Sequence, residues 1–373
     1  MVIRTFGISI LVTIASLFVA FLYGSWTALT LCLILGILEV SLSFDNAVIN
    51  ATVLEKMSEF WQKIFLTIGI LIAVFGMRLL FPLLIVWVTA GLNPVEAFDL
   101  AMNVPEEGSG QESYEEILTA AHPQIAAFGG MFLFMLFLNF ILEDNEIKWL
   151  TWLEKPLATI GKLDSLAVVI AGGSLVLIAE FLAPDDQRAT VMVAGVLGII
   201  TYIAVNGLGE LFHTEELTAE HEQVEKSGGP TDLAKATGKA GFFLFLYLEV
   251  LDASFSFDGV IGAFAITADP IIIALGLGFI GAMFVRSITV YLVRAGTLSE
   301  YRYLEHGAHW AIGALATILF FSIKWHINEI ITGLVGVAFI GAAAASSVYA
   351  NRRDQAAEGL ADKSEKDDVA ATS

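Results

Sequence analysis

The chain has 373 residues, of which 57% are hydrophobic and 16% are charged, and its formal net charge is −20. Charged residues make up about a quarter of an average soluble domain, because charge keeps a surface hydrated, so this composition argues against a soluble globular protein. The sequence has no basic stripe that could bind nucleic acid. Its single cysteine, Cys32, excludes an intrachain disulfide bond.

Long apolar segments follow one another along the chain, and a helix of roughly 20 residues spans the hydrocarbon core of a bilayer. Backbone polar groups cannot face lipid unpaired, so we expect these segments to be helical. The predicted transmembrane helices cover 5–23, 27–54, 64–91, 126–142, 165–183, 189–208, 240–267, 271–293, 308–323 and 328–350. The expected fold class is all-α, a polytopic membrane protein with about ten transmembrane helices.

The distribution of lysine and arginine predicts the orientation of these helices. With the N-terminus in the cytoplasm, 15 of the 19 Lys and Arg residues fall in cytoplasmic segments. Only Arg188 and Lys324 fall outside, and Arg78 and Arg286 lie within helices. Because positive charge is retained on the cytoplasmic side, we expect an integral protein of the plasma (inner) membrane with both termini cytoplasmic.

The predicted domain organisation is a single transmembrane domain over residues 1–350. Residues 351–373 are charged and rich in alanine, which predicts a disordered cytoplasmic tail. The external segment 92–125 carries seven Asp and Glu residues and no Lys or Arg. We expect an acidic, solvated loop here, with a vestibule that concentrates cations as the alternative.

Two stretches of the chain match each other. Residues 39–45 read EVSLSFD and residues 252–258 read DASFSFD; a second match follows, with GILIAVFGMR at 69–78 and GFIGAMFVR at 278–286. The copies are five predicted helices apart, and an odd offset reverses the direction of crossing. We therefore predict an inverted-topology five-plus-five repeat, with repeat one at about 1–183, repeat two at about 189–350 and a site where they meet at mid-membrane.

The two predicted helices that carry the repeated motifs, 27–54 and 240–267, place five carboxylates near the middle of the membrane, where each costs at least about 2.5 kcal/mol on insertion scales. They need a counter-charge, which a bound cation, protons or two intramembrane arginines could supply. Carboxylate, hydroxyl and amide oxygens favour hard divalent cations. The predicted metal ligands are Glu39, Asp45, Asn46, Glu249, Asp252 and Asp258, with Ser43, Ser256, Arg78 and Arg286 in supporting roles.

Other motifs carry less information. The sequence contains no HExxH, GxSxG, P-loop or Rossmann motif, so we expect neither an enzyme nor an organic cofactor. His306 and His309 form an HxxH pair near a predicted loop, which we interpret as a solvated pair because further ligands at metal-site spacing are missing. Asn139 and Asn206 are predicted to form hydrogen bonds between helices.

The motif residues resemble the signatures of the TerC family of tellurium-resistance-associated membrane proteins, within the LysE exporter superfamily. Residues 249–270, EVLDASFSFDGVIGAFAITADP, resemble the second signature, and residues 39–47 resemble the first, in which an acid precedes Asp-Asn by six residues. The resemblance covers about a third of the chain. Gly259 stands where that family usually has Ser, and the additional helices and acidic loop indicate an outlying branch.

The resemblance implies export of a divalent metal cation, chiefly Mn²⁺, with a role in supplying metal to exported proteins. Our hypothesis is a secondary transporter that exports Mn²⁺, with Ca²⁺ as the alternative cation and H⁺ or Na⁺ as the counter-ion. Two further hypotheses stay open: a small-metabolite exporter of the amino-acid type, and a non-transporting scaffold whose acids pair with Arg78 and Arg286. The expected partners are the lipid bilayer and the ion, and the sequence leaves the oligomeric state open.

Overall fold

The computed structural model describes residues 2–42, 44–69, 71, 72, 75, 76, 80, 83, 87, 92–103, 112–163, 165–227, 238–264, 266, 267, 269–295, 301–325, 327 and 329–372. Within these residues the secondary structure is helical and no strand is present, which confirms the all-α class. The helices are α1 (Val2–Leu42), α2 (Phe44–Glu55), α3 (Glu59–Ile64), the π-helix η1 (Phe65–Gly69), α5 (Pro94–Met102), α6 (Tyr114–Leu142), α7 (Thr151–Ile160), α8 (Leu166–Phe181), α9 (Arg188–Ser227), α10 (Gly238–Phe264), α11 (Pro270–Ile273), the π-helix η3 (Ala274–Gly281), α12 (Ala282–Ala295), α14 (Leu304–Ser322) and α15 (Glu329–Thr372).

Five helical segments of the described chain are long and apolar enough to cross a membrane: Thr5–Ile37, Tyr114–Leu142, Arg188–Leu208, Pro270–Val293 and Ile331–Asp354. Large apolar side chains such as Val169, Leu177, Val193 and Ile200 lie exposed on the outer helices. An exposed apolar surface of this extent requires lipid rather than water around it. The chain is therefore an integral membrane protein.

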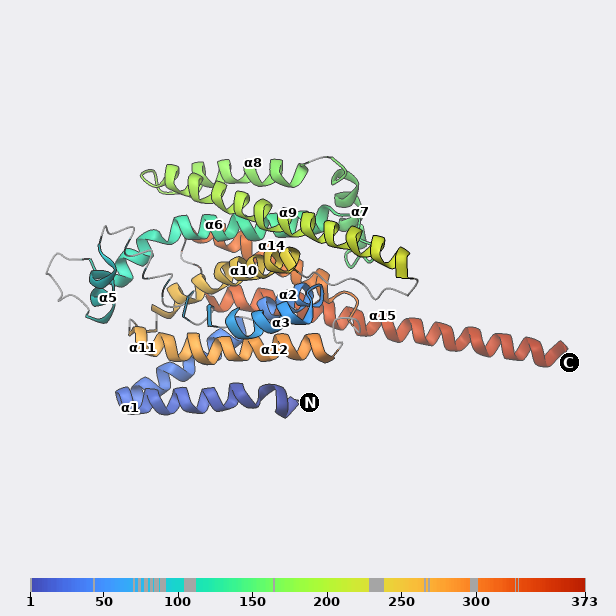
Figure 1. Ribbon diagram of the computed structural model, residues 1–373, viewed down its shortest axis with the longest axis horizontal. Helices are drawn as coiled ribbons and strands as arrows, with labels where there is room; N and C mark the ends of the chain where they lie inside the picture. Colours follow the sequence, from blue (N-terminus) through green and yellow to red (C-terminus); the bar gives the residue numbers. More distant parts are fainter. Residues whose placement is uncertain are drawn as a thin grey trace.

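The helices run side by side along the long axis of the molecule (Figure 1). In that view α8 and α9 form one edge and α1 the other, with α6, α14, α10, α2 and α12 between them. Contacts of α6 with α9 and α14, of α10 with α6 and α9, and of α12 with α1 and α2 join the layers. Helix α15 packs on α14 and then projects beyond the bundle to the C-terminus.

The main core lies where α6, α9 and α10 meet. Phe132 is fully buried, and its ring centroid lies 5.6 Å from that of Tyr202 and 5.9 Å from that of Tyr247. Asn139 Nδ2 donates a hydrogen bond of 2.9 Å to the Tyr202 hydroxyl. This bond joins α6 to α9 and confirms the interhelical role predicted for Asn139.

The segment predicted as an acidic loop, 92–125, contains helix α5 and the first turns of α6 instead. Asn93 and Ser113 each form a capping box, with Glu96 and Glu116 respectively, because side-chain and backbone groups satisfy one another at the helix start. Two of the acidic residues thus begin helices. Hydropathy alone could not detect these starts, because caps are polar.

The tail from residue 351, predicted to be disordered, continues α15 as far as Thr372. The prediction of disorder rested on the charge and alanine content of the tail, but the tail also lacks proline. Alanine, glutamate and lysine are strong helix formers, and a helix that is already nucleated extends at low cost. The structure therefore differs from the expectation here for reasons of local propensity.

The two π-helices occur at equivalent positions of the predicted repeat. When Gly69 is aligned with Gly278, as the sequence match requires, Phe65 at the start of η1 aligns with Ala274 at the start of η3. Such segments are rare and are frequent at functional sites.

We predict that Gly198 is needed for the packing of α9 on α6. A Cβ at this position would lie 2.3 Å from the Phe128 carbonyl oxygen, so Gly198→Ala should destabilise the protein by about 1–3 kcal/mol through overpacking. Gly172→Ala on α8 is the control, because its Cβ would meet no atom within 4 Å. Thermal unfolding in detergent measures both variants, and equal midpoints would contradict the prediction.

Candidate functional site

Buried polar side chains from two helices meet inside the bundle. Asn46 and Asn50 lie four residues apart on α2, and Glu249 and Asp252 lie three residues apart on α10, so each pair shares one helix face. All four are at least nine-tenths buried, with exposed fractions of 1%, 2%, 6% and 6%. Polar groups are buried in a membrane protein only at a cost, which marks these positions as a candidate site.

One hydrogen bond joins the two helices within this group. Asn46 Nδ2 donates to Asp252 Oδ1 over 2.7 Å, between residues 206 positions apart in the chain. A bond to an ionised acceptor is stronger than one between neutral groups. Asn46, predicted as a metal ligand, therefore holds the Asp252 carboxylate in place in this structure.

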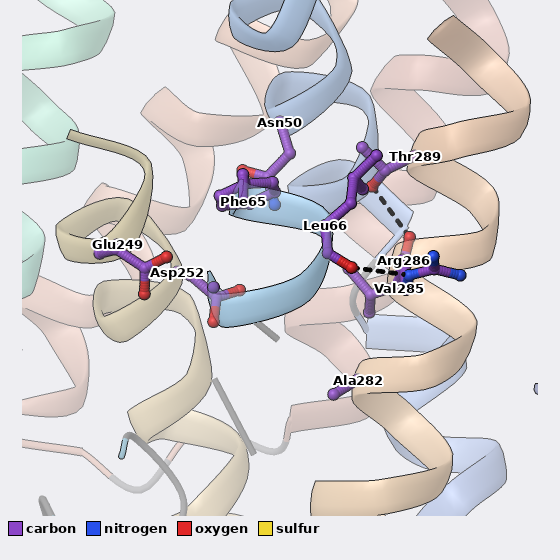
Figure 2. Close-up of a pocket in the computed structure, with 10 residues that line it drawn as sticks. Asn50, Phe65, Leu66, Glu249, Asp252, Ala282, Val285, Arg286 and Thr289 are labelled. Atoms are coloured by element: carbon purple, nitrogen blue, oxygen red, sulfur yellow. Dashed lines mark hydrogen bonds between the residues drawn. The ribbon is translucent and has the colours of Figure 1, made fainter. Parts of the chain in front are cut away.

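A cavity of about 30 Å³ opens beside these residues (Figure 2). Its lining comprises Asn50, Phe65, Leu66, Gly69, Glu249, Asp252, Ala282, Val285, Arg286 and Thr289. Both carboxylate oxygens of Glu249 and the amide oxygen Oδ1 of Asn50 have no hydrogen-bond partner among the residues that the structure describes. The cavity is thus lined by oxygen atoms with unused capacity to accept hydrogen bonds or bind a cation.

The π-helix η1 forms one wall of the cavity. A Cβ at Gly69 would lie 2.7 Å from Glu249 Oε1, so only glycine leaves room for this carboxylate. Arg286 on α12 donates from Nε to the Leu66 carbonyl oxygen over 3.0 Å. In the view of Figure 2, η1 separates the guanidinium group from the acids of α10.

Glu39 is buried as predicted, but it is not among the residues that line this cavity. A Cβ at Gly281 of η3 would lie 2.0 Å from Glu39 Cγ. A carboxylate of the first half therefore packs on a π-helix glycine of the second half, while Glu249 of the second half packs on Gly69 of the first. The two contacts are alike in kind, but the repeat alignment pairs Glu39 with Asp252 and Gly281 with Ile72, so they are not at equivalent positions.

The side chains of five other predicted site residues are not described by the structure. Ser43 and Arg78 are not described, and Asp45, Ser256 and Asp258 are placed on α2 and α10 by their backbone alone. Among the side chains that are described, no three His, Cys, Asp or Glu residues come together as a metal cluster. The six-ligand site therefore stays a prediction, and the described part of it consists of Glu249, Asp252 and their amide neighbours.

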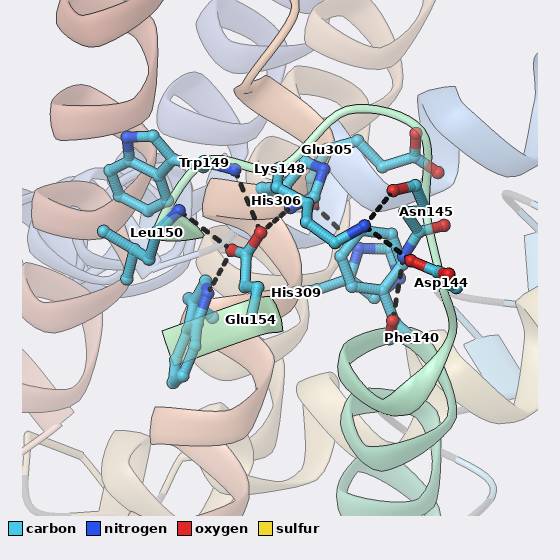
Figure 3. A network of polar contacts seen from close by, with 11 residues as sticks. Phe140, Asp144, Asn145, Lys148, Trp149, Leu150, Glu154, Glu305, His306 and His309 are labelled. Carbon is cyan, nitrogen blue, oxygen red and sulfur yellow. Dashed lines mark hydrogen bonds and ion pairs between the residues drawn. The ribbon is translucent and has the colours of Figure 1, made fainter. Parts of the chain in front are cut away.

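A second polar cluster lies where α7 meets α14 (Figure 3). The buried carboxylate of Glu154 accepts hydrogen bonds from the backbone N–H groups of Trp149 and Leu150 at 2.9 and 3.2 Å, and from Trp310 Nε1 at 3.2 Å. His306 Nδ1 lies 3.3 Å from Oε2 of the same carboxylate. With three donors in place, this carboxylate is held as a structural anchor between the loop, α7 and α14.

The interpretation of His306 and His309 as a solvated pair is wrong, because both are buried. The His309 ring stacks on Phe140 at 3.6 Å between centroids, and its Nδ1 lies 2.8 Å from the Glu305 carbonyl oxygen. Helix α14 begins at Leu304, so both histidines lie on its first turns and pack inward rather than in a loop.

Near this cluster, Lys148 donates a hydrogen bond of 2.7 Å to the exposed Asp144 and lowers the pKa of that carboxyl.

Sequence reasoning missed Asn50 and Thr289 as cavity residues. Asn50 follows Asn46 by one helical turn in an otherwise apolar helix, a spacing that could have placed both amides on the site face. The sequence around Thr289 contains no pattern that would have placed it at the cavity. Its hydroxyl bonds the Val285 carbonyl oxygen of its own helix at 2.9 Å and the Ala47 carbonyl oxygen of α2 at 3.3 Å.

We predict that Asn46→Leu lowers the free energy of unfolding by about 1–3 kcal/mol, because it leaves the buried Asp252 Oδ1 without its hydrogen-bond donor. Asn139→Leu is the matched control, since it removes a neutral bond to Tyr202 worth about 0.5–1.5 kcal/mol. Unfolding in detergent without added metal measures both. A smaller loss for Asn46→Leu than for Asn139→Leu would show that Asp252 does not depend on this bond.

No curated protein and no solved structure matches the chain, and the resemblance to the TerC family stays a prediction. A family model described as a protein of unknown function, DUF475, matches residues 44–354. The matched range includes α2, α10, α12 and every residue that lines the cavity. Since the match spans most of its length, the chain belongs to the DUF475 family.

Proposed function

We propose that this protein is a secondary transporter that exports a divalent metal cation, with Mn²⁺ as the first candidate, through the acidic site between α2 and α10. The observation that carries the proposal is the Glu249 carboxylate. It is 6% exposed, it lines the cavity, and neither oxygen has a hydrogen-bond partner among the described residues. A buried carboxylate in this situation must take up a proton or a cation.

The surroundings of Glu249 favour a metal cation of the hard class. Asp252 lies one helical turn away and faces the same cavity, so two like charges would repel each other unless a positive charge lay between them. Among the described residues, the polar lining offers carboxylate, amide and hydroxyl oxygens and the Arg286 guanidinium, and no sulfur or imidazole nitrogen. Oxygen ligands suit Mn²⁺, Ca²⁺ and Mg²⁺ better than soft metals.

The size of the cavity distinguishes between an ion and a metabolite as the transported species. Its volume of about 30 Å³ suits a body the size of a water molecule, whereas pockets for organic ligands measure about 300–1,000 Å³. An amino acid does not fit in this state. The cavity therefore favours ion transport over the small-metabolite alternative.

The scaffold alternative requires the acids to be neutralised by the intramembrane arginines. Glu249 has no such bond within the described residues, and the Nε of Arg286 is engaged by the Leu66 carbonyl oxygen. An acid that served only to hold helices together would be expected to carry a partner. The lack of such a bond at Glu249 among the described residues therefore favours a function that involves a cation.

Inverted repeats would supply the alternating access that export requires. The equivalent starts of η1 and η3 support the five-plus-five arrangement. In this proposal the chain crosses the plasma (inner) membrane ten times with both termini in the cytoplasm, and H⁺ or Na⁺ exchanges for the metal. Asp45 and Asp258 would complete the ligand set.

We predict that purified protein in proteoliposomes transports Mn²⁺ and that Glu249→Gln reduces the flux at least about tenfold, while the variant still folds because a repulsive charge is removed. Glu180→Gln is the matched control, since Glu180 is exposed and pairs with Arg188 at the surface, where such pairs contribute little. A panel of divalent cations tests selectivity. Unchanged flux in Glu249→Gln would refute the role of this site.

We also predict that Mn²⁺ affinity falls as the pH is lowered and levels off at high pH. Carboxylate ligands must be deprotonated to bind metal, so protons compete with the cation and binding releases them. Calorimetry in buffers of different ionisation enthalpy measures the affinity and the protons released. Saturable binding without proton release at any pH would mean that the acids are already ionised, and would remove the basis for proton coupling.

A further inference from the structure

The side-chain amide of Asn50 is buried beside the cavity. Asn50 is 2% exposed and lines the cavity with Glu249 and Asp252. Its Oδ1 has no hydrogen-bond partner among the described residues. Buried amide oxygens are nearly always bonded, and leaving one unbonded costs free energy, so each exception calls for an explanation.

Two donors of the described cavity lining are engaged by backbone oxygens. The Thr289 hydroxyl donates to the Val285 carbonyl oxygen, and Arg286 Nε donates to the Leu66 carbonyl oxygen. The open positions on Asn50 and Glu249 are acceptors. A small cavity where acceptors from two helices have no hydrogen-bond partner among the described residues is suited to a cation, because acceptors alone can bind a cation.

Figure 2 places this amide opposite the acids. Asn50 enters from α2 at the level of the η1 turn, while Glu249 and Asp252 enter from α10. An ion held between them would be bound by both helices at once. Asn50 would then add an oxygen ligand without adding charge.

We propose that Asn50 is a neutral oxygen ligand of the transported cation and that its neutrality lets the cation leave the site. This inference rests on the proposed transport function and deepens it. The affinity of oxygen sites for divalent cations is tuned by the number of charged ligands. A transporter must release its ion in every cycle, so a site with one ligand kept neutral binds more weakly and turns over faster.

The inference predicts opposite effects for two substitutions of similar size. Asn50→Leu removes the ligand, so the dissociation constant for Mn²⁺ should rise at least about tenfold. Asn50→Asp adds a charge, so the dissociation constant should fall, and the transport rate at saturating Mn²⁺ should fall as well because release slows. Asn139→Leu, which lies in the α6–α9 contact, is the control and should leave Mn²⁺ binding within about twofold of the wild type.

The test uses full-length protein, with Mn²⁺ binding by calorimetry in detergent, Mn²⁺ flux in proteoliposomes and thermal unfolding with and without Mn²⁺. A ligand role predicts that Asn50→Leu keeps or raises the metal-free unfolding temperature, because an unbonded amide is removed, but loses the stabilisation by Mn²⁺. A purely structural amide would lower the metal-free unfolding temperature and leave that stabilisation intact, which would overturn the inference.

The controls distinguish the proposed transport function from the proposed role of Asn50. Absence of saturable Mn²⁺ binding to the wild type would refute the proposed function itself. Wild-type binding with an unchanged dissociation constant in Asn50→Leu would refute the role of Asn50 alone. If Asn50→Leu does not fold, Asn50→Asp decides, because unchanged affinity and unchanged rate in that variant contradict the inference.

Discussion

The arrangement of the site depends on one carboxylate that is buried without a hydrogen-bond partner in the described structure, that of Glu249. Gly69 must lack a side chain because this group occupies the space beside it. Arg286, the cation whose side chain lines the same cavity, donates to a backbone carbonyl on η1. Within the described residues nothing bonds the Glu249 carboxylate, and this links the packing of α10 against η1 to the proposed function in cation binding.

The all-α class could be predicted from the sequence, because hydropathy directly reports the length of chain that lipid can surround. The apolar segments 165–183 and 240–267 correspond closely to α8 and α10. Prediction failed where the decisive features were local and polar. Helix α6 starts at a capping box in an acidic segment, and α15 continues because alanine and alternating charges sustain a helix that the bundle has already nucleated.

The candidate site could be predicted only in part. The polar residues in and beside the repeated motif include Glu249, Asp252 and Asn46, which are buried on two helices that meet. The role of Asn46 as a donor to Asp252 could not be derived, since spacing along one helix does not say which atom of a neighbouring helix it will meet. Asn50 was missed for the related reason that an amide in an apolar helix is commonly a packing contact. The partner from the other helix determines its role, and sequence alone does not supply that partner.

Two buried glutamates in this protein illustrate why burial alone does not identify a functional acid. Glu154 and Glu249 are 3% and 6% exposed, and both lie inside the helical bundle. Glu154 accepts three hydrogen bonds and lies beside His306, so its charge is balanced by the fold. Glu249 accepts none from the described residues. Hydrogen bonds to Glu154 offset the free-energy cost of its burial, whereas for Glu249 this cost is left for a ligand to offset. This difference in partners, more than the residue type, makes Glu249 on α10 the candidate functional acid.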